Sequence, residues 1–338
     1  MMTEMRHEPW PSRSALLEMA GAYRGPCVLG AAAELDVWSV LGDQRLTAEE
    51  IAGRLRADLR ATRMLLDALA ALRVLAKSEE RYSVPAELRP LLTAGTPQSI
   101  LPMIHHGMNI LRNWTQLAWV VKAGIAPPRQ ASIRGFDADR AAFIAAMHVV
   151  SGPIADDVVA KLGPLEFRHL LDVGGASGTW TIAFLRAIGG ARATIFDLPD
   201  AIHQARDRFA GTELAHRVAF AAGDFYRDEL PPGADFAWLS AIIHQHARDD
   251  SRALFAKVFR ALEAGGRIGI RDIVMEPCRT RPVVGALFAI NMLVNTDRGG
   301  TFTFAEIAED LQAAGFRDPE LRVRSDEMSS VVIARKPK

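Results

Sequence analysis

The fold of this chain is decided by a stretch that reads His169-Leu170-Leu171-Asp172-Val173-Gly174-Gly175-Ala176-Ser177-Gly178. A short apolar run ends in an acid, and a glycine-rich turn then leads into a segment with helical character, 179–185. This order predicts a strand, a tight loop and the start of a helix, the usual frame for a nucleotide-like ligand at a strand's carboxyl end. Glycine suits such a turn because it tolerates unusual backbone angles and lets a ligand approach closely. A glycine turn alone also occurs as plain loop chemistry, so the flanking sequence has to decide.

Strand and helix patterns alternate after this turn. The predicted strands are 193–196, 217–220, 236–240, 267–270, 320–324 and 330–334. One predicted helix ends at 209, and two others cover 249–262 and 304–315. Such alternation predicts an α/β fold with a doubly wound, mostly parallel sheet that binds ligands at its strand ends.

Acidic residues stand at three successive strand ends, Asp172, Asp197 and Asp224. A carboxylate at the end of the second strand, here Asp197, is placed to accept hydrogen bonds from a ribose diol. The loop reads GGASG rather than GxGxxG, and it contains no basic residue to meet a pyrophosphate. The pattern therefore favours a ligand without phosphates, such as S-adenosylmethionine.

The composition limits the classes of partner. A length of 338 residues predicts two domains, and a hydrophobic content of 49% allows a sizeable core. Forty basic residues balance 40 acidic ones. This balance gives no reason to expect nucleic acid or an anionic membrane as a partner. Two cysteines without CxxC spacing, Cys27 and Cys278, fit a reducing cytosol. The polar first residues do not resemble a secretory signal. We also expect no apolar run that approaches the roughly 20 residues of a membrane span. Together these observations predict a cytoplasmic protein.

The N-terminal third is predicted to be mostly helical, with helices at 14–40, 48–55 and 59–75. Thr47 and Glu50 form a capping-box pattern, and 76–84 indicates a hairpin with a charged turn. This order is typical of a winged helix. Arginines and aspartates are mixed on the second helix of the pair, so an interaction module is favoured over a DNA reader.

Two more helical segments, 100–129 and 138–162, precede the glycine turn. The first contains methionine, histidine and tryptophan side chains, and the second contains methionine and histidine, all of which either pack in a core or border a site. The adjacent His105 and His106 invite a metal interpretation. We expect no metal site there, because neighbouring helix residues point about 100° apart.

The chain resembles the S-adenosylmethionine-dependent small-molecule O-methyltransferases of plants and bacteria, which include caffeate, hydroxyindole and polyketide enzymes. The motifs that carry this resemblance are 171–178, Phe196-Asp197-Leu198-Pro199, Gly223-Asp224-Phe225, Ile243-His244, 261–267 and Ala313-Ala314-Gly315-Phe316. The resemblance implies a winged-helix dimerisation domain at 1–100, a helical linker bordering the substrate site at 101–165, and at 166–338 a Rossmann-like class I methyltransferase domain with a seven-stranded sheet. It also implies a homodimer formed through the N-terminal helices.

The resemblance assigns the cofactor contacts as well. Gly174 and Gly175 would approach the methionine tail, and Asp197 with the adjacent Leu198 would bind at the ribose. The adenine contacts would come from Asp224 and Phe225. Ser240 occupies a position where the plant enzymes often have a lysine near the adenine.

His244 falls at the position of the family's catalytic base, and histidine is suited to take a phenol proton near neutral pH. Asp272 is expected beside it, at a position usually held by glutamate, to fix the imidazole tautomer. The family's His-Asp-Trp is here His244-Gln245-His246, and Gly300–Thr303 replaces the segment of a second flanking glutamate. These departures leave His246 as an alternative base.

The apolar segment 285–293 matches the family's acceptor-lining helix. Its polar and sulfur-containing side chains, together with those of the earlier helices, predict a mostly apolar, aromatic acceptor. These candidate substrate residues are Met103, Trp114, Met147, His148, Asn291 and Met292, and core packing is the alternative for each. Three other functions stay open: methyl transfer to carbon or nitrogen, a cofactor-binding enzyme of altered chemistry, and a winged-helix regulator that senses S-adenosylmethionine.

Overall fold

The computed structural model describes residues 10–175 and 178–338. The chain divides into two compact units, each described here by itself. The first comprises Met1–Met108 and Ser132–Gly135, and the second comprises Asn109–Ala131 and Phe136–Lys338.

The first unit is helical with a small sheet. Its elements are α1 (Arg13–Gly21), α2 (Arg24–Glu34), α3 (Val37–Leu41), β1 (Leu46–Thr47), α4 (Ala48–Leu55), α5 (Leu59–Ala71), β2 (Ala76–Ser78), β3 (Arg81–Ser83), α6 (Arg89–Leu92) and the first part of α7 (Leu101–Trp114). The helical stretch predicted at 14–40 is three helices, and the break between α2 and α3 falls at Asp36, which has a left-handed backbone with φ 59°. The helix predicted at 59–75 ends at Ala71, ahead of the left-handed Arg73.

The capping box and the hairpin of this unit are confirmed. Thr47 accepts from the backbone of Glu50, whose carboxylate accepts from the Thr47 N–H. Strands β2 and β3 pair antiparallel across Glu79 and Glu80, which both have positive φ, and β1 adds a third strand beside β3. A two-residue hairpin turn with positive φ at both central residues has the same twist as the strands that it joins, so both φ values suit this hairpin.

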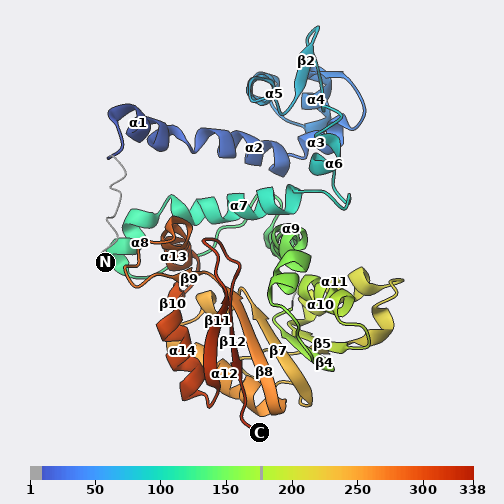
Figure 1. Cartoon of the computed structure of the whole chain (residues 1–338). Coiled ribbons are helices and arrows are strands. Elements are labelled where there is room, and N and C mark those ends of the chain that lie inside the picture. The colour runs from blue at the N-terminus through green and yellow to red at the C-terminus, as the bar shows by residue number, and fades with distance from the viewer. Residues whose placement is uncertain (1–9, 176–177) are drawn as a thin grey trace. The chain divides into compact units, whose positions relative to one another are not determined.

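The second unit is built on a seven-stranded sheet of order β11-β12-β8-β7-β4-β5-β6, in which only β12 runs antiparallel (Figure 1). The predicted doubly wound, mostly parallel sheet is therefore confirmed. Its strands are β4 (His169–Val173), β5 (Arg192–Asp197), β6 (Val218–Ala222), β7 (Ala234–Ser240), β8 (Leu262–Asp272), β11 (Arg317–Val323) and β12 (Ser330–Arg335), and the short strands β9 (Val274–Met275) and β10 (Phe302–Thr303) pair beside it.

Helices pack on both faces of this sheet. Those on its faces are α9 (Phe136–Lys161), α10 (Thr179–Ala187), α11 (Pro199–Phe209), α12 (Arg248–Ala261) and α14 (Phe304–Ala313). Helix α13 (Val283–Asn295) instead contacts α8 (Leu117–Ala123) and the short strand β9, and 3-10 turns lie at Ala215–Arg217 and Ile243–Gln245. One core joins strand residues such as Leu171 and Leu239 to α12 and α14, and the other joins Leu170 and Trp238 to α9 and α10. Alternate residues of one strand thus supply two cores, as expected for a sheet covered on both faces.

Helix α9 corrects one expectation. We expected no apolar run of membrane-spanning length, yet this 26-residue helix is long and apolar enough to cross a bilayer by length and composition. Its buried residues Ala155, Val158 and Val159 pack with Trp180 and Phe184 of α10, which is the behaviour of a core helix. The helical segment predicted at 100–129 is split into α7 and α8, and it ends ahead of Pro127 and Pro128.

Candidate active site

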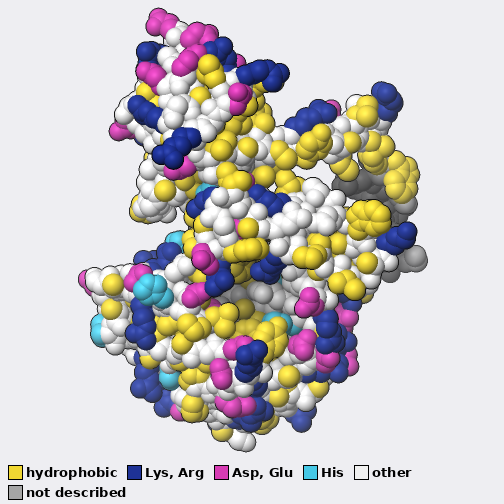
Figure 2. Space-filling view, turned by 180° about the vertical axis from the view of Figure 1, so that it is seen from behind, with side chains coloured by type: hydrophobic (Ala, Val, Ile, Leu, Met, Phe, Trp, Pro, Cys, Tyr) yellow, Lys and Arg dark blue, Asp and Glu magenta, His cyan; other side chains and the backbone are white. Residues whose placement is uncertain are grey.

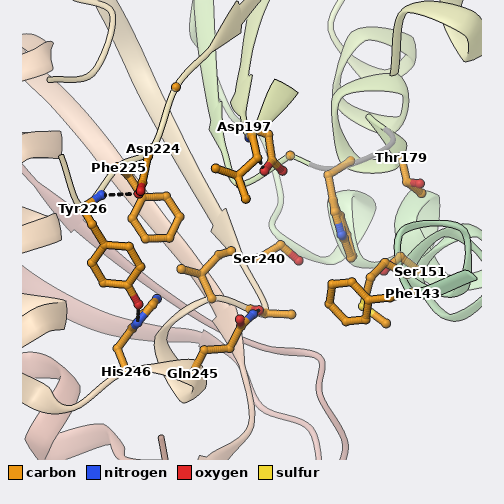
Figure 3. Close-up of a pocket in the computed structure, with 18 residues that line it drawn as sticks. Phe143, Ser151, Thr179, Asp197, Asp224, Phe225, Tyr226, Ser240, Gln245 and His246 are labelled. Atoms are coloured by element: carbon orange, nitrogen blue, oxygen red, sulfur yellow. Dashed lines mark hydrogen bonds between the residues drawn. The ribbon is translucent and has the colours of Figure 1, made fainter. Parts of the chain in front are cut away.

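A cavity of about 330 Å³ lies at the carboxyl ends of strands β4 to β7 (Figure 3). Its lining is contributed by the strand ends, the 3-10 turn after β7 and the helix α9. The lining residues are Phe143, Met147, Ser151, Gly174, Gly175, Thr179, Trp180, Asp197, Leu198, Gly223, Asp224, Phe225, Tyr226, Ser240, Ala241, Ile242, Gln245 and His246. All seven residues predicted to bind a cofactor are therefore brought to one cavity.

The glycine turn forms one wall of the cavity. Gly174 has φ 67°, and a Cβ there would lie 2.4 Å from Cδ1 of Ile242. A Cβ on Gly175 would lie 2.8 Å from the carboxyl carbon of Asp172. Both positions therefore require glycine. Ala176 and Ser177 of the same turn lie outside the described residues.

The Asp172 carboxyl lies beneath this turn and is almost completely buried. Its Oδ2 accepts a hydrogen bond of 2.7 Å from the Thr181 hydroxyl, whereas its Oδ1 has no hydrogen-bond partner among the residues that the structure describes. Burial raises the pKa of Asp172 to about 7, because the ionised form loses its hydration. This carboxyl is therefore a structural part of the turn rather than a group of the cavity lining.

The next two strand ends hold the predicted ribose and adenine residues. Asp197 follows β5, and its Oδ1 accepts from the backbone N–H of Leu198 at 2.7 Å. Asp224 follows β6, and its Oδ1 accepts from the backbone N–H of Tyr226 at 2.9 Å. Figure 3 shows Asp197 and Asp224 on the same side of the cavity, with the Phe225 ring below Asp224.

His244 and Asp272 form a buried pair. Nδ1 of His244 lies 2.9 Å from each carboxylate oxygen of Asp272, and the two side chains are 8% and 2% exposed. The backbone N–H of Ile273 donates to Oδ1 of Asp272, and the Phe288 ring meets the imidazole edge-on. The predicted contact between these two residues is present, although His244 is not among the residues that line the cavity.

His246 has different surroundings. It lines the cavity, and its Nδ1 makes a short hydrogen bond with the Tyr226 hydroxyl, as Figure 3 shows. Burial lowers the pKa of His246, and its buried Nε2 has no partner among the described residues. Sequence reasoning missed Tyr226, although its place directly after the Asp224-Phe225 motif was a usable signal.

The candidate acceptor residues are dispersed. Met147 lines the cavity, whereas the His148 ring bonds to the Thr179 hydroxyl at 2.8 Å, and burial lowers the pKa of His148 to about 4. Trp114 Nε1 donates to the Asn291 side-chain oxygen at 2.9 Å, and the adjacent Met292 is buried. The remaining candidate, Met103, belongs to the first unit.

A second cavity of about 830 Å³ shares Tyr226, Gln245 and His246 with the first. Its other lining residues are Asn113, Ala126, Pro127, Pro128, Arg129, Asp250, Asn295, Thr296, Asp297 and Arg298. The two cavities together give room for a cofactor and a small second substrate.

The lining of the first cavity suits S-adenosylmethionine. Among the residues that the structure describes, no lysine or arginine lines it, so no cationic side chain there would pair with a pyrophosphate. Two carboxylates, Asp197 and Asp224, line it instead, and carboxylates suit a ligand that carries a sulfonium and hydroxyl groups. The glycine turn leaves space where a Cβ would otherwise stand.

Comparison with known proteins agrees with this geometry. Residues 112–317 match the model of the O-methyltransferase domain, and residues 17–87 match that of the O-methyltransferase dimerisation domain. The tetracenomycin polyketide synthesis 8-O-methyl transferase TcmO of Streptomyces glaucescens is 30% identical over 332 residues, 96% of each chain. Acetylserotonin O-methyltransferase of Gallus gallus is 28% identical and covers 91% of this chain and 93% of its own. The structure of human N-acetylserotonin methyltransferase in complex with SAM superimposes with a TM-score of 0.81, at 24% identity, over 99% of this chain and 100% of that one.

The chain belongs to the O-methyltransferase family. It is an S-adenosylmethionine-dependent O-methyltransferase with a Rossmann-like methyltransferase domain and a dimerisation domain, as the resemblance implied.

Proposed function

We propose that this enzyme methylates a hydroxyl group of a small aromatic acceptor, with His244 as general base. The observation that carries this proposal is the buried contact of His244 Nδ1 with both oxygens of Asp272. The cofactor supplies an activated sulfonium methyl, so the chain itself has to orient the acceptor oxygen and remove its proton.

Asp272 acts through His244. Its carboxylate accepts the Nδ1–H, which leaves the lone pair on Nε2 to accept the proton that the acceptor hydroxyl loses. The same carboxylate stabilises the imidazolium that results, and the Ile273 N–H keeps the carboxylate in place. A base with this arrangement commonly contributes about 10² to 10⁴-fold to the rate.

His246 is the weaker candidate for the base. Its Nδ1 is bonded to a phenol rather than to a carboxylate, and burial disfavours its protonated form by lowering its pKa. It adjoins the Phe225 ring, edge to face at 5.6 Å. His246 therefore belongs with the adenine end of the cofactor cavity.

The cofactor roles follow the places of the residues in the cavity. Gly174 and Gly175 receive the methionine tail, and Asp197 with Leu198 receives the ribose. Asp224 and Phe225 then border the adenine, because they follow β6, the strand beyond β5 in the sheet. Ser240 follows β7, on the other side of β4, and contacts the cofactor from there. These assignments are proposals for each residue.

The acceptor is proposed to be aromatic because apolar side chains, Phe143 and Met147, line the cavity beside the cofactor residues. The names of the relatives support this class, since one acts in tetracenomycin polyketide synthesis and another on acetylserotonin. Acceptor contacts by Met103, Trp114, His148, Asn291 and Met292 stay predictions.

A homodimer is proposed through the N-terminal unit. Its dimerisation-domain match, residues 17–87, covers the second half of α1 and all of α2, where large apolar side chains are exposed, as on Leu17, Met19 and Tyr23. Figure 2 shows apolar side chains along these helices and mixed charges over α4 and α5. Such an apolar surface is typical of an obligate subunit interface. The domain boundaries and a cytoplasmic location stay predictions, and two free cysteines support the latter.

The test is methyl transfer from labelled S-adenosylmethionine to a panel of phenols, amines and carbon acids. We expect transfer to phenols, and we expect Asp197→Ala to weaken S-adenosylhomocysteine binding by about 10-fold or more. Asp207→Ala, on the exposed side of α11, is the matched control and should bind normally. Transfer to amines or carbon acids alone, or normal binding by Asp197→Ala, would contradict the proposal.

A further inference from the structure

A buried arginine lies directly behind the cofactor cavity, and the proposed mechanism does not use it. Arg271 on β8 is 1% exposed. Its Cα pairs in register with that of Ser240 on β7, so the two side chains stand on the same face of the sheet. Ser240 lines the cavity, and its hydroxyl accepts a hydrogen bond of 3.0 Å from a terminal guanidinium nitrogen of Arg271.

A second wall residue of the cavity also contacts this guanidinium. The Arg271 Cζ lies 4.6 Å from the centroid of the Trp180 ring, a cation–π distance. Trp180 is the second residue of α10, the helix that begins immediately after the glycine turn. The guanidinium therefore lies close to the end of the cavity where the proposed methionine-tail residues Gly174 and Gly175 are.

The charge of Arg271 has no carboxylate partner within the described part of the chain. Among the described residues, its buried Nε has no hydrogen-bond partner, and a terminal guanidinium nitrogen donates to the neutral hydroxyl of Ser240. Asp272, next in sequence, projects to the other face of the sheet, where its oxygens accept from His244 and Ile273. Burial lowers the pKa of Arg271 to about 10, which leaves the guanidinium charged at neutral pH.

A buried charge without a partner is costly, and an opposite charge brought by a ligand offsets that cost. S-adenosylmethionine carries one carboxylate, at the end of its amino-acid tail. We propose that Arg271 is a positioning residue that recognises this carboxylate, with its charge acting across the cavity wall and with Ser240 as the hydrogen-bond donor at the surface. Because the Ser240 oxygen already accepts from Arg271, its own O–H is free to donate into the cavity.

This inference rests on the cofactor site proposed above, and it predicts an effect that depends on the carboxylate of the ligand. Arg271→Met keeps an unbranched, apolar side chain of similar length and removes the charge. We expect it to weaken S-adenosylhomocysteine binding by about 10 to 100-fold, the range for a hydrogen bond to a charged group. Binding of decarboxylated S-adenosylhomocysteine, which keeps the amine and lacks only the carboxylate, should change less than about threefold.

The measurement is calorimetric titration of each ligand into the enzyme without acceptor, so an acidic acceptor cannot be the source of the effect. Arg271→Lys should retain part of the discrimination between the two ligands, because it keeps a charge without the planar fork. Arg217→Met is the matched control. Its guanidinium donates to the carbonyls of Leu185, Ile188 and Ala191, so its loss should affect both ligands equally.

Three results would overturn the assignment. Equal losses for both ligands in Arg271→Met would mean that the arginine only supports the fold of the cavity wall. Unchanged affinity for S-adenosylhomocysteine would mean that it does not act on the cofactor. An effect limited to the KM of an acidic acceptor would place its action on the other substrate. Failure of the wild-type protein to bind either ligand would refute the proposed cofactor site itself, which separates the two failures.

Discussion

Two regions of the second unit differ in the surroundings of their polar side chains. We call the ends of β4, β5 and β6 the glycine-turn edge, and the region of His244, Asp272, Trp114 and Asn291 the histidine edge. At the glycine-turn edge, carboxylates and backbone groups at the ends of β4, β5 and β6 surround a cavity, and Asp197 and Asp224 line it. At the histidine edge, the polar side chains are bonded to one another, in the buried pair of His244 with Asp272 and in the half-buried pair of Trp114 with Asn291. In the proposed mechanism, cofactor binding therefore uses turns that the sheet topology places, whereas proton transfer and acceptor contacts depend on side-chain pairs between distant segments.

The strongest test of this comparison is His244→Ala. We expect kcat to fall by about 10² to 10⁴-fold while S-adenosylhomocysteine affinity stays within about threefold, because the base lies outside the cofactor lining. Steady-state kinetics and binary titration measure the two quantities. His246→Ala, at the shared boundary of the two cavities, should instead raise the KM for the cofactor. The reverse pattern would exchange the roles of the two histidines.

A second test concerns Asp172 at the glycine-turn edge. Its folded-state pKa of about 7 exceeds the ordinary 3.8, so the folded protein keeps a proton that the unfolded chain loses. Asp172 therefore adds stability that is fully present below about pH 4 and is lost as the pH rises through 7. At about 1.4 kcal/mol per pH unit, this contribution amounts to at most about 4 kcal/mol.

Asp172→Asn should remove this dependence while it keeps the Thr181 hydrogen bond. Urea unfolding between pH 4 and 8 should show a variant that gains stability relative to wild type as the pH rises. Asp207→Asn, on an exposed carboxyl, is the control and should follow the wild-type curve. A constant difference between Asp172→Asn and wild type across this pH range would refute the buried neutral carboxyl.

Asp272→Asn tests the other residue of the buried His244–Asp272 pair. We expect kcat to fall by roughly 10²-fold, because an amide neither fixes the Nδ1–H tautomer by charge nor stabilises the imidazolium. The pH profile of kcat should also lose or shift its acidic limb, which a purely structural effect would leave in place. An activity close to wild type would remove Asp272 from the mechanism.

Asn291→Ala should have the smallest effect, mainly on stability. It leaves the Trp114 indole N–H without its acceptor and removes a partner of Asn295, at a cost of about 1 to 3 kcal/mol. If Asn291 also contacts the acceptor, the KM for the acceptor rises in addition. Thermal unfolding and acceptor kinetics together distinguish core packing from substrate binding, the two interpretations that the sequence left open.

The helix predictions failed where single backbone angles interrupt a continuous apolar pattern. The stretch 14–40 keeps helical periodicity, yet Asp36 adopts a left-handed angle and separates α2 from α3. Helix α9 shows a different limit of prediction from the sequence, because length and composition alone do not distinguish a core helix from a membrane span. Its burial against α10 makes that distinction.

The sequence by itself determined the alternating α/β fold, the capping box at Thr47, the glycine turn and the strand-end acids. These features depend on local backbone preference and on periodicity, which are written in consecutive residues. Only the tertiary structure decided that Tyr226 meets His246, that Trp114 meets Asn291, and that Arg271 lies between Ser240 and Trp180 without a carboxylate partner in the described chain. Such contacts join segments up to 177 residues apart, and they arise from the order and register of strands that no local pattern specifies.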